Sequence, residues 1–156
     1  MRQKKFVLAA DFEDQDNIDL YAIHSPSEDF FLAFQLNKTL GTKFKNVTEK
    51  IEPDIKVPFF SRFISELSSI DAPWELIANH YNYPSMIKDE NQLFTTQIEK
   101  QVSLIPSVSK VDYFLKVPKN NFTSDHLSQL QNLNEIQMVY PIFETKIKQN
   151  PNLIFD

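Results

Sequence analysis

The chain of 156 residues contains no cysteine, which excludes disulfide bonds, thiol nucleophiles and cysteine-ligated zinc. It has a single glycine, Gly41. Phosphate-cradling loops need several glycines to bring backbone N–H groups close to a ligand, so P-loop and dinucleotide-binding fingerprints are excluded. No run reaches the roughly 20 apolar residues that would span a bilayer, and Asp11 interrupts the apolar start. We therefore expect a cytoplasmic protein without a membrane segment or secretion signal.

Basic residues are also too few to balance the acidic ones. The formal net charge is −5, and nonspecific attraction to phosphate backbones needs a positive field, so a nucleic-acid partner is disfavoured. An RNA-associated protein that uses exposed Tyr and Phe is the third hypothesis. Apolar residues make up 42% of the chain, and 14 residues are Phe, a composition typical of a folded globule. One core suffices at this length, so residues 1–156 are expected to form a single domain.

Short β-rich runs predict most of the ordered structure as strands. The predicted strands are 5–12, 18–24, 42–47, 59–66, 74–79, 101–105, 111–117 and 136–143. The polar region 82–97 predicts a mobile loop, and 144–156 a C-terminal tail. With two main helices added, the predicted fold class is α+β, with a mostly antiparallel β-sheet.

The first predicted helix carries signals at both ends. The run Ser25-Pro26-Ser27-Glu28 has the pattern of a capping box with proline at the first helical position. The helix should begin there and run to Leu40, because Gly41 can take the left-handed conformation that often ends helices. The second helix is expected over 125–133, with Ser124 as its cap.

The side chains of the first helix divide into a wide apolar stripe and a polar side. At about 100° per residue the stripe is wide enough to predict a mostly buried helix. Its apolar members are Phe30, Leu32, Ala33, Phe34, Leu36 and Leu40. Asn37 lies within the stripe, where an unpaired amide would cost about 1–3 kcal/mol, so a buried hydrogen bond to a neighbouring strand is expected. Phe31 falls on the polar side and is a candidate for a binding patch.

The segment Ile105-Pro106-Ser107-Val108-Ser109-Lys110-Val111-Asp112-Tyr113 resembles the signature of the IPExxxVDY family, small proteins found mainly in Bacteroidetes. Ser107 stands where the family has Glu, so no role of that carboxylate carries over. The likeness extends through 29–37 and 74–79. In such proteins the stretch matching 59–79 resembles a strand pair, which favours a strand at 59–66 over the helix that its spacing also fits. The family name implies no reaction, cofactor or ligand.

The motif segment itself predicts an architectural corner. Pro106 cannot donate a ladder hydrogen bond and pushes Ile105 toward an extended conformation, so one strand should end there before Val111 begins the next. Alternation would place Val111 and Tyr113 on one face of that strand and Asp112 on the other. Asp112 could bind a ligand or accept hydrogen bonds from backbone N–H groups. The second role is favoured, because carboxylates near turns usually serve local hydrogen bonds.

Candidate chemistry is sparse. His24 lies at a strand end near Asp29 and is the best general-base candidate, although no nucleophile motif or HExxH spacing accompanies it. The acidic residues within 11–19 lack the glycine and terminal Glu of a calcium loop, so no metal or cofactor is predicted. The leading hypothesis is a non-catalytic interaction domain, which binds an unknown protein or self-associates. The alternative is a small enzyme or small-molecule-binding protein with a pocket near His24, Asp29 and Asp112.

Overall fold

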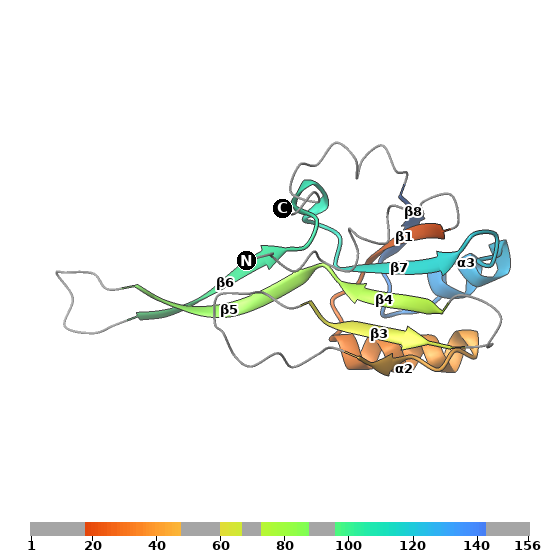
Figure 1. Cartoon of the computed structure of the whole chain (residues 1–156), viewed down its shortest axis with the longest axis horizontal. Helices are drawn as coiled ribbons and strands as arrows, with labels where there is room; N and C mark the ends of the chain where they lie inside the picture. The colour runs from red at the N-terminus through yellow and green to blue at the C-terminus, as the bar shows by residue number, and fades with distance from the viewer. Residues whose placement is uncertain (1–17, 48–59, 67–72, 88–95, 143–156) are drawn as a thin grey trace, which may run out of the picture.

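The computed structural model describes residues 18–47, 60–66, 73–87 and 96–142 (Figure 1). The predicted strand at 5–12 and the tail at 144–156 lie outside the described residues. The elements, in chain order, are β1 (Ile18–His24), α2 (Asp29–Leu40), β2 (Lys45–Asn46), β3 (Arg62–Ser65), β4 (Trp74–Ala78), β5 (His80–Ile87), β6 (Thr96–Ser103), the 3-10 turn η2 (Pro106–Val108), β7 (Tyr113–Pro118), α3 (Ser124–Gln131) and β8 (Met138–Pro141).

Six strands form one antiparallel sheet in the order β2-β3-β4-β7-β1-β8. The predicted α+β class is therefore confirmed, as is the antiparallel pairing of the strands predicted at 59–66 and 74–79. β7 and β8 lie on either side of β1, and α3 connects them in sequence. Both edge strands are short, which limits the unpaired backbone that the sheet offers to other chains.

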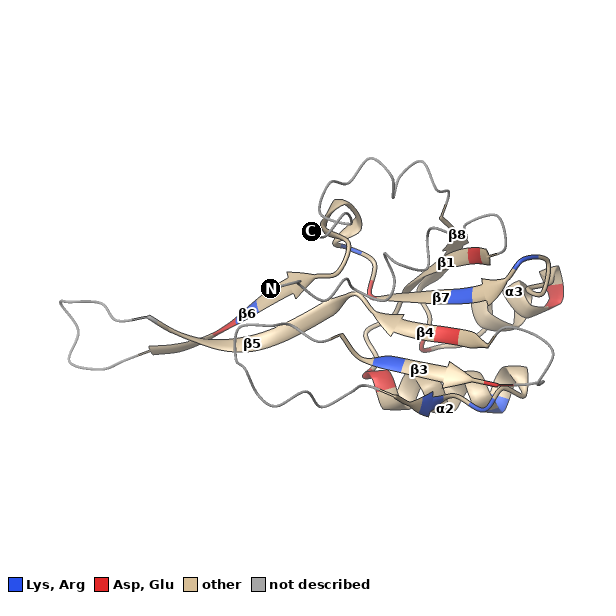
Figure 2. Cartoon of the chain, viewed as in Figure 1, with Lys and Arg blue, Asp and Glu red and all other residues tan. Residues whose placement is uncertain are grey.

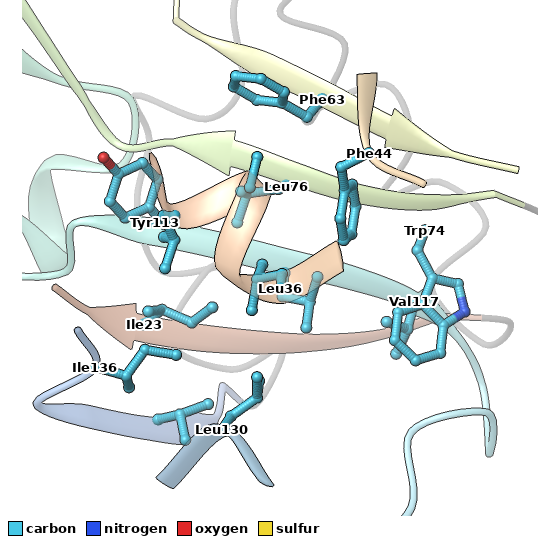
Figure 3. Packing of buried hydrophobic residues seen from close by; sticks show 14 of the residues in the cluster. Ile23, Leu36, Phe44, Phe63, Trp74, Leu76, Tyr113, Val117, Leu130 and Ile136 are labelled. Atoms are coloured by element: carbon cyan, nitrogen blue, oxygen red, sulfur yellow. The ribbon is translucent and has the colours of Figure 1, made fainter. Parts of the chain in front are cut away.

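Both helices contribute to the core on one face of the sheet (Figure 3). Leu36 of α2 and Leu130 of α3 belong to one cluster with Ile23, Leu76 and Tyr113 from the strands. Residues that alternate with these point to the other face. The cluster on that second face combines strand residues with residues that precede β7 and one that follows β8: Leu20, Ala22, Ile77, Leu104, Ile105, Val111, Phe114 and Ile142.

Strands β5 and β6 form a separate two-stranded ribbon that extends away from the six-stranded sheet (Figure 1). They pair along their whole length, from His80 opposite Ser103 to Ile87 opposite Thr96. The predicted loop over 82–97 is therefore wrong for 82–87 and 96–97, while 88–95 lies outside the described residues. A ribbon that leaves the core needs no continuous apolar face, so its polar sequence looks like a loop.

Helix α2 begins later than its sequence predicts and ends where expected. Its N-cap is Glu28, which makes no side-chain cap bond. The Ser25 hydroxyl instead donates to the carbonyl of Glu135 at 2.5 Å, so the predicted capping box does not form. At the other end, Gly41 adopts φ 71° and its N–H donates to the carbonyl of Asn37. The left-handed C-terminal glycine is therefore confirmed.

Helix α3 is capped by a neighbour of the predicted residue. The hydroxyl of Thr123 accepts the N–H of His126, and Nδ1 of His126 accepts the N–H of Thr123. The prediction of Ser124 as the cap is wrong by one position, because the residue with extended backbone geometry is Thr123. His126 thus completes a capping box with Thr123.

Candidate functional site

The outward side of α2 consists largely of phenylalanine. Four of its twelve residues are exposed, and three of these are Phe30 at 62%, Phe31 at 48% and Phe34 at 59% relative exposure. The fourth is Lys38. We call Phe30, Phe31 and Phe34 the aromatic face. Phe31 is exposed as predicted, but the prediction that Phe30 and Phe34 are buried is wrong, because the buried stripe of the helix is narrow.

Contacts at the start of α2 hold the aromatic face in place. The ring of Phe30 meets the ring of buried Phe63 edge-on, with centroids 5.4 Å apart. Asp29 accepts a hydrogen bond from the hydroxyl of Ser61, which precedes β3. Because these contacts join the helix start to the strand below it, the outward phenyl rings sit on a fixed support.

Asn37 holds the other end of the helix. Its Oδ1 accepts the hydroxyl of Thr42 at 2.9 Å and the N–H of Phe44 at 2.7 Å, and its Nδ2 donates to the Phe44 carbonyl at 3.3 Å. The expected hydrogen bonding is confirmed. Its partners lie in the chain directly after the helix, however, and not on a neighbouring strand, because Gly41 turns the chain back toward Asn37.

A second asparagine with three side-chain hydrogen bonds is Asn79, the one residue between β4 and β5. It is completely buried. Its Nδ2 donates to the carbonyls of Val108 and Val111, and its Oδ1 accepts the N–H of Ile105 at 2.9 Å. Its own carbonyl accepts the N–H of Leu104 at 2.7 Å. Sequence reasoning missed this role, because the side-chain partners of Asn79 lie 26 or more positions away.

We call Asn79 and residues 104–112, which include most of the family motif, the motif corner. Pro106 opens the turn η2 at a position where no N–H is needed. Ile105 and Val111 are buried together on the face of the sheet opposite the helices. The prediction that Val111 and Tyr113 share a face is wrong. Tyr113 lies on the helix side, because β7 begins only at Tyr113 and strand alternation does not extend back to Val111.

Asp112 binds backbone, as favoured from the sequence. Its Oδ2 accepts the N–H of Ser25 at 2.8 Å. Its Oδ1 lies 3.6 Å from Nδ1 of His80, whose Nε2 donates to the carbonyl of Ser109 at 2.6 Å. Asp112 therefore connects the motif corner to the chain between β1 and α2 and to the base of the ribbon.

The hydroxyl of Tyr113 joins the start of β7 to the chain that precedes α2. It donates to the carbonyl of Ser27 at 2.7 Å. Burial raises the pKa of Tyr113 well above its usual range, and the negative charges of Asp29 and Asp112 raise it further.

His24 pairs with an aromatic residue of β8. Its Nε2 lies 2.9 Å from the hydroxyl of Tyr140, and the two rings stack with centroids 5.5 Å apart. Tyr140 packs against the cluster on the second face of the sheet, whereas Tyr113 is on the helix side. The structure therefore places the pair of His24 and Tyr140 across the sheet from Tyr113.

Three neighbouring strands carry charged residues whose partnership the sequence did not indicate. Nη2 of Arg62 donates to Oε1 of buried Glu75 at 2.5 Å, and Nζ of Lys116 lies 3.7 Å from Oε2. Glu75 and Lys116 are opposite each other in the register of β4 and β7. The charges compensate one another within the sheet, so this row is a structural feature.

Comparison with family models, curated proteins and solved structures finds no match to this chain. The resemblance to the IPExxxVDY family therefore stays a prediction based on the residues quoted above. Neither of the helices in the described ranges is long and apolar enough to cross a bilayer. Among the same residues, no group of three or more His, Cys, Asp or Glu side chains is arranged to hold a metal ion.

Proposed function

We propose that this chain is a non-catalytic protein-interaction domain and that the aromatic face of α2 is its binding surface. The observation that carries the proposal is that three of the four exposed positions of α2 are Phe. The solvent side of a surface helix normally carries polar and charged residues. Contiguous apolar surface at such a place is typical of an interaction site.

The area available is sufficient for a weak to moderate interaction. A phenyl side chain presents about 200 Å², so the three exposed fractions leave about 340 Å² of apolar surface. At about 25 cal/mol per Å², covering this surface contributes about 8 kcal/mol before the cost of association, which is about 4–15 kcal/mol. The partner must therefore add contacts of its own around the rings.

The fixed position of the rings favours binding. Phe30 is supported by Phe63, and both ends of α2 are tied to neighbouring chain through Asp29 and Asn37. Because the helix is held at both ends and Phe30 packs against Phe63, the backbone that carries the rings loses little conformational entropy when a partner covers them.

The alternative proposal, a small enzyme or ligand-binding protein with a pocket near His24, Asp29 and Asp112, has less support. His24 bonds to Tyr140 across the sheet from Tyr113. Asp29 and Asp112 accept hydrogen bonds from Ser61 and Ser25. Groups that already serve the fold are less available for proton transfer or ligand binding.

A photo-reactive phenylalanine analogue at position 31 of the full chain tests the proposal in cells. We expect a covalent adduct whose partner is identified by mass spectrometry and which disappears when Phe34→Glu is added. The matched control places the same analogue at Gln129, an exposed position of α3, and should give no such adduct. Equal labelling from both positions would count against the aromatic face as the binding surface.

A further inference from the structure

Opposite charges flank the aromatic face along the axis of α2. Glu28, the N-cap, is exposed at one end, and Lys38 is exposed in the last turn. Figure 2 shows acidic colouring at the start of α2, and Lys38 is the one basic residue within the helix. At 1.5 Å per residue, Glu28 and Lys38 are about 15 Å apart along the axis, with the phenyl rings between them.

The charges on one copy of α2 are complementary to those on a second copy that runs in the opposite direction. In an antiparallel pair of α2 helices centred at the level of Leu32, Phe30 of one copy faces Phe34 of the other. Lys38 then lies within one turn of Glu28 of the other copy, and the two helix dipoles oppose each other favourably. A parallel pair would instead bring like charges together at both ends. The charge pattern thus selects one orientation of a second copy.

We propose that the partner of the aromatic face is a second copy of this chain, with the two α2 helices packed antiparallel about a two-fold axis. This inference rests on the proposed function and names its partner. An isologous contact of this kind closes on itself, so assembly stops at the dimer.

The contact is small. Two aromatic faces together supply about 700 Å² of apolar surface, less than a standard-size interface of about 1,600 Å². The charged rim extends it, since Lys38 and Glu28 appear at both ends of the contact. A dimer of this size is expected to be reversible, with a Kd of about 10–100 µM.

Charge reversal tests the orientation by sedimentation velocity on the full chain over a range of concentrations. Lys38→Glu alone and Glu28→Lys alone each replace two attractive contacts by two repulsive ones, so each should weaken the dimer about tenfold or more. An equimolar mixture of the two variants recreates both opposite-charge contacts and should form a heterodimer of about wild-type affinity. Recovery on mixing cannot come from a variant that fails to fold.

Two further variants complete the design. Phe34→Glu places a charge at the centre of the contact and should give a monomer at all concentrations. Gln129→Glu makes a similar change on the exposed side of α3 and should leave the dimer unchanged. Fluorescence of Trp74, the only tryptophan, verifies that each variant is folded.

The results separate this inference from the proposed function. A wild-type chain that stays monomeric up to about 1 mM, or a mixture that stays monomeric, overturns the antiparallel dimer. If the adduct from position 31 is then a different protein, the interaction domain stands and only the second copy is excluded. If the adduct forms only within one molecule, or if no adduct forms, both proposals are removed.

Discussion

Replacing Asn79 by alanine should destabilise this protein more than any other single change to a polar side chain in the motif corner. Asn79 is completely buried, and its side chain makes three hydrogen bonds, to Ile105, Val108 and Val111. The alanine variant leaves two carbonyls and one N–H without these bonds at the base of the ribbon. Each buried group left unsatisfied costs about 1–3 kcal/mol.

The expected loss in the free energy of unfolding is about 3–6 kcal/mol, allowing for partial relaxation and for water entering the site. That loss is a large share of the roughly 5–15 kcal/mol that holds a typical domain together. Asn79→Asp keeps the size of the side chain and the acceptor for Ile105. A carboxylate cannot donate to the Val108 and Val111 carbonyls, so this variant should lose at least as much stability.

Urea unfolding followed by the fluorescence of buried Trp74 measures the effect. The matched control is Asn82→Ala, since Asn82 is exposed on β5; its free energy of unfolding should stay within about 0.5 kcal/mol of wild type. A loss below about 1 kcal/mol for Asn79→Ala would refute the reasoning. It would mean that the motif corner is held by its packing and not by this amide.

Three other perturbations follow from the structure. The pKa of Tyr113 is raised above its ordinary 10.0. Above about pH 10 the unfolded chain therefore loses the Tyr113 proton while the folded chain keeps it. The free energy of unfolding should then fall as the pH rises further. Tyr113→Phe should make that fall less steep in urea titrations at successive pH values. Gly41→Ala forces alanine into φ 71° and should cost about 1 kcal/mol of stability by the same assay. Glu75→Gln removes the carboxylate between Arg62 and Lys116. It should lower the free energy of unfolding by about 3 kcal/mol.

Each of these has its own control. Tyr140→Phe, on the other face of the sheet, should retain the alkaline loss that Tyr113→Phe reduces. Gly41→Asn should cost less than Gly41→Ala, because Asn tolerates the left-handed region. Glu99→Gln, exposed on β6, should change stability by less than about 0.5 kcal/mol. Equal effects for any variant and its control would contradict the corresponding assignment.

Sequence signals predicted helix ends correctly where the helix end depends only on neighbouring residues. Gly41 ends α2 because only the backbone of one turn is involved. The capping-box pattern at Ser25 failed because distant partners outcompete it: the Ser25 N–H binds Asp112, 87 positions away, and its hydroxyl binds Glu135, 110 positions away. A four-residue pattern carries no information about such partners.

The spacing of apolar residues predicted the centre of the buried stripe of α2 but not how wide the stripe is. Leu32, Ala33 and Leu36 were correctly placed inside, whereas Phe30 and Phe34 face out. Whether an apolar residue at the margin of a stripe is covered depends on how many layers surround the helix, which the spacing of residues does not encode. The same sequence therefore predicted a buried helix where the structure has a candidate interaction surface.

The candidate site was predictable only in part. Asp112 near a turn predicted backbone hydrogen bonds from its type and position, and the structure shows the bond to Ser25. Asn79 offered no comparable signal, since an asparagine at the end of a strand is ordinary. Its importance arises because the returning chain at Ile105 and Val111 passes beside it.

The attachment of the ribbon has a mechanical consequence. β5 continues from β4 after one residue, and β4 is an interior strand, between β3 and β7. Both strands of the ribbon meet at Asn79, whose carbonyl binds Leu104 just after β6. A force applied along the ribbon is therefore transmitted to β4 in the middle of the sheet. The hydrogen bonds that join β4 to β3 and to β7 must then break together before the sheet unfolds.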